Sequence, residues 1–212
     1  NYNLDPNLCE EILKNNKIKA IVVTDYAGHP ADWEDFYYLK KKYKVQLIND
    51  NCHAIGSKLN NKLNYATNYA DLVTMSFHPV KNITTGEGGA IFLNNEKLYK
   101  KAKLLRSHSI DRDNYLKNKK GMWHYDIKDL GFNYRLTEFQ SALGISQLKK
   151  LNIFLKKRRK IAKISNKHFL INENFIIPQV VSLTEHEYHL YPIQINFKQL
   201  KISKTLIFKN SI

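Results

Sequence analysis

Lys81 is the residue whose type and position most directly suggest chemistry. It follows the mostly apolar segment 71–77 and precedes Gly86, Gly88 and Gly89, all within eight residues. The apolar run is typical of a buried strand, and the glycines indicate a turn after it. Functional side chains collect at such strand ends. A lysine amine in this setting can form a Schiff base with a carbonyl compound.

The ordinary interpretation of Lys81 is a solvated surface charge. Lysine and arginine together make up 34 of the 212 residues, and most lysines of globular proteins lie exposed. The position of Lys81 between an apolar segment and a glycine-rich turn favours the chemical interpretation over this one.

Asp50 and His53 form a second candidate group. They follow the apolar segment 45–48 and lie three residues apart. One interpretation is functional, since a carboxylate and an imidazole at a strand end can contact a ligand. The other is a structural turn, in which Asp50 caps backbone amides and His53 is a satisfied, partly buried imidazole.

The elements around these residues predict a parallel sheet. Residues 19–24 read as a short buried strand, Asp32 resembles a helix N-cap with acids after it, and a helix runs to about Tyr43 before the strand at 45–48. A strand, a helix and a strand over this length form a βαβ unit with parallel strands. Asp50 then lies just past a carboxyl strand end, where ligands bind in open α/β sheets.

Further elements follow along the chain. Segments 71–77 and 89–93 read as strands on either side of Lys81, and a helix begins near Asn95 and runs through Leu104. Residues 107–122 are polar and predict a surface loop. Thr137 and Gln140 have the capping-box pattern and open a long helical region that we expect to break near Leu151. Pro178 and the segment 190–197 indicate the start of a second domain.

Composition bounds the class of protein. Apolar residues make up 43% of the chain, enough for a core, and no apolar run approaches the roughly 18 residues that a membrane span needs. The first residues lack the basic and then apolar pattern of a signal peptide. The two cysteines, Cys9 and Cys52, are neither a disulfide framework nor spaced as metal ligands. These features predict a cytoplasmic protein without a metal site.

The formal charge of +15 raises the alternative of a nucleic-acid or membrane-surface binder. The lysines are spread over the chain, however, and only residues 156–160 form a dense basic block. That block lies within a helical pattern with apolar residues on one face, which favours a solvated helix face. No nucleic-acid-binding signature accompanies it, so we expect neither nucleic acid nor membrane as a partner.

Taken together, these segments resemble the DegT family of pyridoxal-phosphate-dependent nucleotide-sugar aminotransferases. The resemblance extends from Asn3 to about Pro192 and rests on three phrases: residues 76–90, Arg106-Ser107-His108 and residues 130–151. It implies an α/β fold of the aspartate-aminotransferase type (PLP fold type I), with a large domain built on a mostly parallel sheet with flanking helices and the start of a small C-terminal α+β domain.

The resemblance also implies a role for each candidate residue. Lys81 would form the internal aldimine with pyridoxal 5'-phosphate and later carry the proton between substrate and cofactor. Asp50 would pair with the protonated pyridine nitrogen, since a carboxylate favours the charged ring. His53 would stack on the ring, Ser76 would donate its hydroxyl to the phosphate, and Asn133 would reach the phosphate in the neighbouring subunit of a homodimer.

The implied reaction is transfer of an amino group, with L-glutamate as donor and 2-oxoglutarate as product, to C4 of a UDP-linked 4-keto-6-deoxy sugar. Within the family the resemblance is strongest to transaminases of pseudaminic acid biosynthesis, and perosamine-type enzymes share the same cofactor residues. Related dehydratases carry histidine in place of the lysine, so Lys81 favours transamination.

The resemblance predicts an incomplete cofactor pocket. The chain starts with Asn1 and ends at Ile212 just after an apolar stretch, and we expect it to be cut at both ends. Residues 1–150 would then be a large domain without its N-terminal phosphate-binding part, and 151–212 a linker helix and the beginning of the small domain. The alternative function is an inactive fragment, or one part of a split aminotransferase, that acts as an interaction module.

Overall fold

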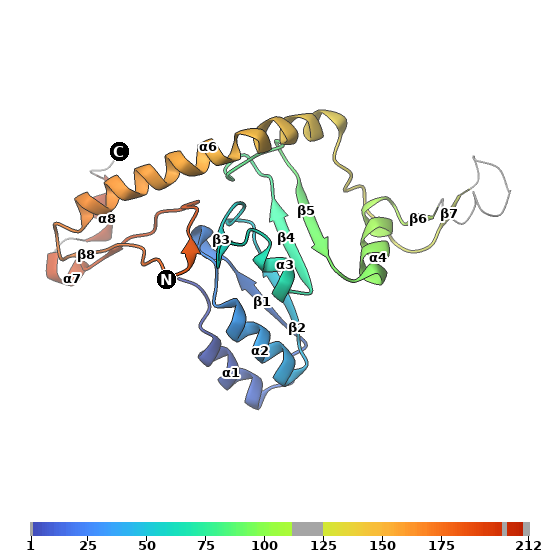
Figure 1. Ribbon diagram of the computed structural model, residues 1–212, viewed down its shortest axis with the longest axis horizontal. Helices are drawn as coiled ribbons and strands as arrows, with labels where there is room; N and C mark the ends of the chain where they lie inside the picture. The colour runs from blue at the N-terminus through green and yellow to red at the C-terminus, as the bar shows by residue number, and fades with distance from the viewer. Residues whose placement is uncertain (1, 112–124, 201–202, 210–212) are drawn as a thin grey trace.

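The first elements of the chain form the predicted parallel βαβ unit (Figure 1). The computed structural model describes residues 2–111, 125–200 and 203–209. After helix α1 (Pro6–Asn15) come strand β1 (Ala20–Thr24), helix α2 (Trp33–Tyr43) and strand β2 (Gln46–Asp50). The two strands pair in parallel with Thr24 opposite Asp50. Asp50 is therefore the last residue of β2, where the sequence places it just beyond the strand.

The central sheet continues through the strands on either side of Lys81. Its order is β1-β2-β4-β5. β4 (Leu72–Ser76) runs parallel to β2, with Thr74 opposite Asp50, and β5 (Gly89–Leu93) returns antiparallel to β4. The carboxyl ends of the three parallel strands share one edge of the sheet, and Figure 1 shows the long helix α6 crossing the molecule above β4.

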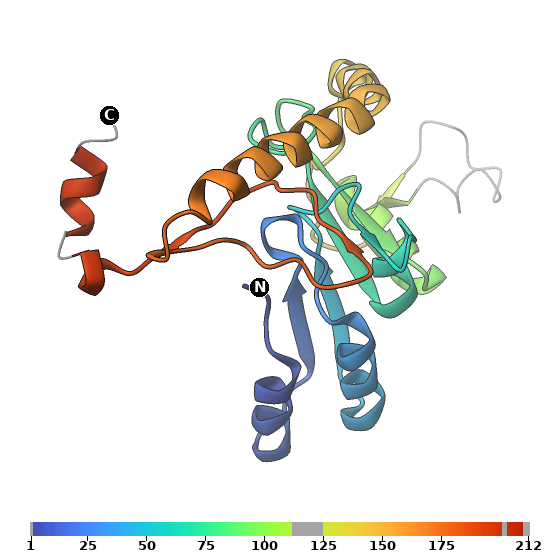
Figure 2. The same ribbon diagram turned by 60° about the vertical axis from the view of Figure 1, so that its left-hand side comes forward.

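Helices α1, α2 and α3 (Tyr65–Tyr69) pack on one face of this sheet and form the core with it. Trp33, Phe36 and Leu47 are each 0% exposed in that core. Figure 2 shows α1 and α2 lying along β1 and β2. Alternate strand residues point to the opposite face, where Val22 and Ile91 are 57% and 55% exposed. Within the described residues the sheet is thus covered mainly from one side.

Helix α6 (Glu138–Phe169) begins as the sequence predicts. Thr137 Oγ1 accepts a hydrogen bond from the Gln140 backbone N–H, and Gln140 Oε1 accepts one from the Thr137 backbone N–H, which completes the capping box. The predicted break near Leu151 is wrong, because α6 is one continuous helix of 32 residues. Neither proline nor glycine interrupts the helix around Leu151, and Leu151 and Leu155 both pack against Gly56. The expected domain boundary at 150 falls inside this helix, and the division into two domains stays a prediction.

Short elements complete the fold. Helix α4 (Glu96–Arg106) follows β5, and β3 (Lys58–Leu59) pairs with β9 (Thr184–Glu185). β6 (Ile110–Asp111) pairs with β7 (Asp126–Ile127), and β8 (Phe175–Ile176) with β10 (Gln194–Ile195). The 3-10 turn η1 (Tyr26–Gly28) lies between β1 and α2, and helices α7 (Phe197–Leu200) and α8 (Lys204–Lys209) come last. From residue 112 on, the predicted loop 107–122 lies outside the described residues.

Candidate functional site

Lys81 lies in the connection between β4 and β5, which hydrogen bonds shape into a compact turn. Phe77 N–H donates to Gly88 O at 2.8 Å, and Phe77 O accepts from Thr85 N at 3.0 Å. Lys81 N–H donates to His78 O at 2.9 Å. The Lys81 side chain is half-buried. The turn therefore fixes the backbone of the lysine and leaves its amine within reach of a ligand.

The first turn of α6 is hydrogen-bonded to this β4–β5 turn. Gln140 Nε2 donates to Glu87 O at 3.0 Å, and Thr85 Oγ1 donates to the same carbonyl at 2.7 Å. A Cβ added at Gly88 would overlap the side chains of Thr85 and Leu136. Gly88 is thus needed for close packing of the turn against the residues that precede α6.

Asp50 and His53 lie on the neighbouring strand end. Asp50 Oδ1 accepts a hydrogen bond from Cys52 N at 3.1 Å, and the turn closes with Ala54 N donating to Asn51 O at 3.0 Å. His53 Nδ1 accepts from Ala27 N at 3.4 Å. The structural interpretation of this turn is therefore correct as far as it goes, since Asp50 caps an amide. Both side chains are half-buried, so a ligand can still reach them.

Electrostatic coupling connects this turn to Lys81. Burial lowers the pKa of His53, the charge of Lys81 lowers it further, and the Asp50 carboxylate opposes both. Burial also raises the pKa of the Cys52 thiol to about 11, with the Asp50 carboxylate adding to the shift and Lys81 opposing it. The charges of Lys81 and Asp50 thus both act on His53, which is neutral near pH 7.

Ser76 is the last residue of β4, and Asn133 lies elsewhere. Ser76 Oγ accepts from His78 N at 3.4 Å, at the entrance to the Lys81 turn. Asn133 is exposed, and its backbone bridges to Ser107. Among the described residues, no hydrogen bond or ion pair connects Asn133 with the other four candidates. The structure therefore groups Lys81, Asp50, His53 and Ser76, and leaves Asn133 on an outer surface.

A C-terminal segment that the sequence does not single out packs beside this group. We call residues 185–190 the strap. Glu187 N donates to Gly28 O at 3.0 Å, and the rings of His53 and His189 have centroids 4.5 Å apart. Burial, His53 and Lys81 lower the pKa of His189 to about 4. Three ionisable residues within four positions, His186, Glu187 and His189, are a sequence signal that could have drawn attention to the strap.

The strap is held by two members of the basic block on α6. Arg158 Nη1 donates to Tyr188 O at 3.1 Å and His189 O at 3.3 Å. Arg159 pairs with Glu187, which is 0% exposed, and with Glu185 at 3.0 Å. The sequence prediction of a solvated helix face is therefore wrong for these two arginines, because their partners lie far away in the sequence, and correct for the exposed Lys156, Lys157 and Lys160.

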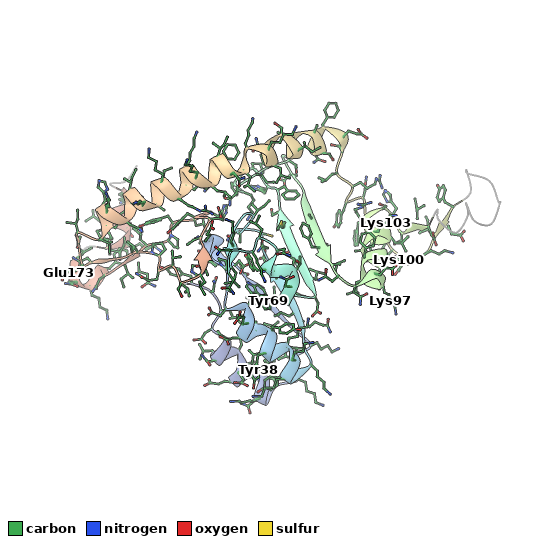
Figure 3. The ribbon with its side chains drawn as sticks, viewed as in Figure 1. Tyr38, Tyr69, Lys97, Lys100, Lys103 and Glu173 are labelled. Carbon is green, nitrogen blue, oxygen red and sulfur yellow. The ribbon has the colours of Figure 1, made fainter. Side chains whose placement is uncertain are left out.

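The remaining positive charge is distributed over the molecule. Figure 3 shows Lys97, Lys100 and Lys103 together on α4, at the opposite end of the molecule from Glu173. A cavity of about 430 Å³ lies between α6 and the chain around the strap, lined by residues that include Arg159, Lys163 and Tyr188. None of the five candidate residues lines this cavity. We therefore place the candidate site by its chemistry, at the ends of β2 and β4.

Within the part of the chain that the structure describes, no group of three or more His, Cys, Asp and Glu side chains could hold a metal ion. None of the described helices combines the length and the apolar character that crossing a bilayer would require.

The residues at the strand ends suit pyridoxal phosphate. A half-buried amine lies close to a carboxylate and a neutral imidazole, and these are the groups that bind an aldehyde, a ring nitrogen and a ring face. The buried Nδ1 of His189, which has no hydrogen-bond partner in the described structure, adds an unused polar atom beside them. The donor set therefore fits this cofactor.

The fold and the site define a family, and comparison with known proteins agrees. Residues 1–209 match the model of the DegT/DnrJ/EryC1/StrS aminotransferase family. The chain belongs to this family, which confirms the resemblance seen in the sequence. The α/β fold of the aspartate-aminotransferase type is confirmed as well, by a solved relative.

That solved relative is Helicobacter pylori PseC, an aminotransferase involved in the biosynthesis of pseudoaminic acid. It has a TM-score of 0.86 and 36% identity to this chain, and the match covers 98% of this chain and 53% of PseC. A UDP-4-amino-4,6-dideoxy-N-acetyl-beta-L-altrosamine transaminase of Campylobacter jejuni is 40% identical over 98% of this chain and 53% of its own length. GDP-perosamine synthase of Escherichia coli O157:H7 is 34% identical over 83% of this chain and 44% of its own length.

The chain spans about half the length of the curated relatives that it matches. The family and the fold follow from these matches.

Proposed function

We propose that this chain carries the lysine-containing half of a pyridoxal-phosphate-dependent aminotransferase site. The reaction would transfer an amino group from L-glutamate to C4 of a UDP-linked 4-keto-6-deoxy sugar, in pseudaminic acid or related surface-sugar biosynthesis. The observation that carries the proposal is the grouping of Lys81, Asp50 and His53 at adjacent parallel strand ends. Family membership supports transamination over an inactive interaction module.

Lys81 would bind the cofactor and move the proton. Its Nζ would hold pyridoxal phosphate through the aldehyde group of the cofactor, and the free amine would serve as the base and acid at the substrate carbon. When bound, the cofactor supplies an electron sink for the negative charge that develops there. The fixed backbone of the 77–88 turn would keep the amine at one position through both proton transfers.

Asp50, His53 and Ser76 would hold the cofactor. The Asp50 carboxylate would pair with the protonated pyridine nitrogen and accept a hydrogen bond from it. His53 would cover the ring face as a neutral imidazole, and Ser76 would donate its hydroxyl to the phosphate. All three side chains are half-buried, which limits water without closing the site.

A homodimer would complete the site, with Asn133 of each copy reaching the cofactor phosphate of the other. The exposed apolar side chains beside Asn133 support an interface there: Phe132 is 44% exposed, Tyr134 70% and Phe139 89%. Exposed apolar groups gathered on one surface mark interaction sites. The free thiols of Cys9 and Cys52 support a cytoplasmic location, where thiols stay reduced.

The proposed sugar follows the relatives of highest identity among those described. The Campylobacter transaminase and Helicobacter PseC, at 40% and 36%, are both named for the altrosamine or pseudoaminic acid pathway. GDP-perosamine synthase, at 34%, is the competing sugar class. Amino transfer from L-glutamate to a panel of UDP- and GDP-linked 4-keto sugars separates the two.

The lysine assignment is tested by reductive trapping. The 212-residue chain is incubated with pyridoxal phosphate, reduced with borohydride and digested, and the modified lysine is located by mass spectrometry. The same is done with a chimera that adds the part of Helicobacter PseC outside the match. We expect a visible absorbance band before the reduction and a label on Lys81 after it. Lys81→Ala should lose both, and Lys62→Ala, at an exposed lysine, should keep both. Equal labelling of several lysines in both proteins would refute the assignment.

A further inference from the structure

Asp25 is a fully buried carboxylate that the proposed reaction does not use. It is 0% exposed and follows the carboxyl end of β1. Its Oδ1 accepts hydrogen bonds from Ala31 N at 2.8 Å and Trp33 Nε1 at 2.9 Å. Burial raises the pKa of Asp25, and these donors oppose the rise. An N–H group can only donate, so both bonds favour the ionised carboxylate.

The other carboxylate oxygen binds the two chain neighbours of Asp50. Asp25 Oδ2 accepts from Asn49 Nδ2 at 3.0 Å and from Asn51 Nδ2 at 2.7 Å. Tyr65 OH donates to the same oxygen at 2.9 Å. Asn49 and Asn51 are both buried. One carboxylate thus holds the side chains on both sides of Asp50.

This arrangement determines where Asp50 points. Successive strand residues face opposite sides of a sheet. With Asn49 and Asn51 anchored on the helix-covered side, the Asp50 side chain faces the other side, where it is half-buried. The backbone is held as well, because Asp25 N donates to Asp50 O at 3.1 Å.

The anchored segment lies beside the strand that leads to Lys81. Asp50 is opposite Thr74 of β4, and the charges of Asp50 and Lys81 both act on His53 and Cys52. A carboxylate that must meet a ring nitrogen needs a fixed direction, since a displacement of about 1 Å can cost roughly 100-fold in activity. The Asp25 bonds supply that constraint from the opposite side of the sheet.

We propose that Asp25 is a positioning residue for Asp50: by binding Asn49 and Asn51 it directs the Asp50 carboxyl to the face of the sheet away from the helices. The assignment rests on the proposed function, in which Asp50 meets the cofactor ring nitrogen. Asp25 itself touches neither cofactor nor substrate. Its effect passes through the two asparagines and the backbone of Asp50.

The test uses one readout without the cofactor and one with it. The first readout is amide hydrogen exchange in Asp25→Asn. The reporter is the Cys52 amide, which donates to Asp50 Oδ1 at 3.1 Å, and the reference is the Leu47 amide, which donates to Asp71 Oδ2 at 2.9 Å. The second is the dissociation constant of pyridoxal phosphate, measured by its absorbance. Asp25→Asn should speed exchange at Cys52 about tenfold more than at Leu47 and weaken the cofactor about 10- to 100-fold.

Two further variants make the result decisive. Tyr65→Phe removes one donor and should give smaller changes of the same sign, even if Asp25→Asn fails to fold. The double variant Asp25→Asn with Asn51→Asp exchanges carboxylate and amide and should recover both readouts. Equal acceleration at Cys52 and Leu47 in every variant would show mere loss of stability and overturn the proposal. If the wild-type chain and the chimera bind no cofactor, the proposed function fails, and exchange at Cys52 still decides whether Asp25 positions Asp50.

Discussion

The imidazole rings of His53 and His189 lie against each other, with centroids 4.5 Å apart and planes inclined by 35°. His53 follows β2, whereas His189 belongs to the strap. Burial is the first cause of the lowered pKa of each ring, and the positive charge of Lys81 contributes to both. Both imidazole rings are therefore neutral near pH 7, so the pair adds no positive charge beside the lysine.

Removing the His189 ring should change the titration of His53. In His189→Gln, water gains access to the His53 ring, the cost of charging it falls, and its pKa should rise toward the ordinary value of 6.5. His189→Phe keeps a flat apolar ring and should leave the pKa of His53 low. The measurement is a pH titration of the histidine resonances by NMR.

His168 supplies the control for that titration. It lies exposed near the end of α6, and His168→Gln should leave the His53 resonance unchanged. An unaltered His53 midpoint in His189→Gln would mean that other groups, such as Lys81 and the surrounding chain, account for the whole shift.

The local elements were predictable from the sequence, and their long-range partners were not. Apolar runs predict β1, β2 and β4, and the Thr137–Gln140 pattern predicts the start of α6, because these signals depend on neighbours in sequence. The pairing of Arg159 with Glu187 gives no such local signal, since a charged residue normally indicates a surface. Asp25 could have been noticed by the rule that identified Asp50, because both stand at the end of a parallel strand.

Ionisation of Glu187 should contribute to the pH dependence of the free energy of unfolding. Burial raises its pKa to about 7 from 4.5, although Arg159 opposes the rise. Between these values the native state holds a proton that the unfolded chain has released, so this group makes stability fall as pH rises through the window. Glu187→Gln has no carboxyl to ionise and does not show this loss of stability. Its free energy of unfolding should therefore gain about 3 kcal/mol on the wild type between pH 4.5 and 7.5.

The matched control is Glu185→Gln. Hydrogen bonding to Lys58 is the main cause of the lowered pKa of Glu185, so its stabilising contribution is present above 4.5 and is lost as pH falls below that value. Across the window from 4.5 to 7.5 the Glu185→Gln difference should stay flat. Denaturant titrations at several pH values measure both. A flat difference for Glu187→Gln as well would show that its carboxyl is ionised throughout.

The chain segments around Asn133 should depend on the absence of a side chain at Gly131. A Cβ there would overlap the backbone of His108 and Ser109. Gly131→Ala should therefore destabilise the protein by about 3 kcal/mol and speed exchange of the Tyr134 amide, which donates to Arg106 O at 2.9 Å.

Gly86→Ala separates this overlap from backbone strain. Gly86 has φ of +81° with open space around its Cβ position, so alanine there should cost only about 1 kcal/mol. Denaturant unfolding compares the two variants. Equal losses would mean that residues 131–134 move aside easily, and the backbone pairing that holds Asn133 would then be too loose to orient it.

Arg159 should be the most sensitive member of the basic block. Arg159→Ala leaves the buried Glu187 carboxylate without its partner. Because Arg159 is 37% exposed and the pKa of Glu187 is already about 7, the carboxyl can take up a proton instead, and the loss of stability at pH 8 should be about 1 kcal/mol. Lys160→Ala, at the adjacent exposed position, should change stability by less than about 0.5 kcal/mol.

Adding Glu187→Gln to Arg159→Ala removes the unpaired charge and should recover most of the loss, because the penalty comes from that charge and not from missing contacts. Denaturant unfolding of the four proteins at pH 8 measures this coupling. If the double variant were as unstable as Arg159→Ala alone, the arginine would act instead through its bonds to Glu185 and to the His186 carbonyl, which it meets at 3.0 Å and 3.3 Å.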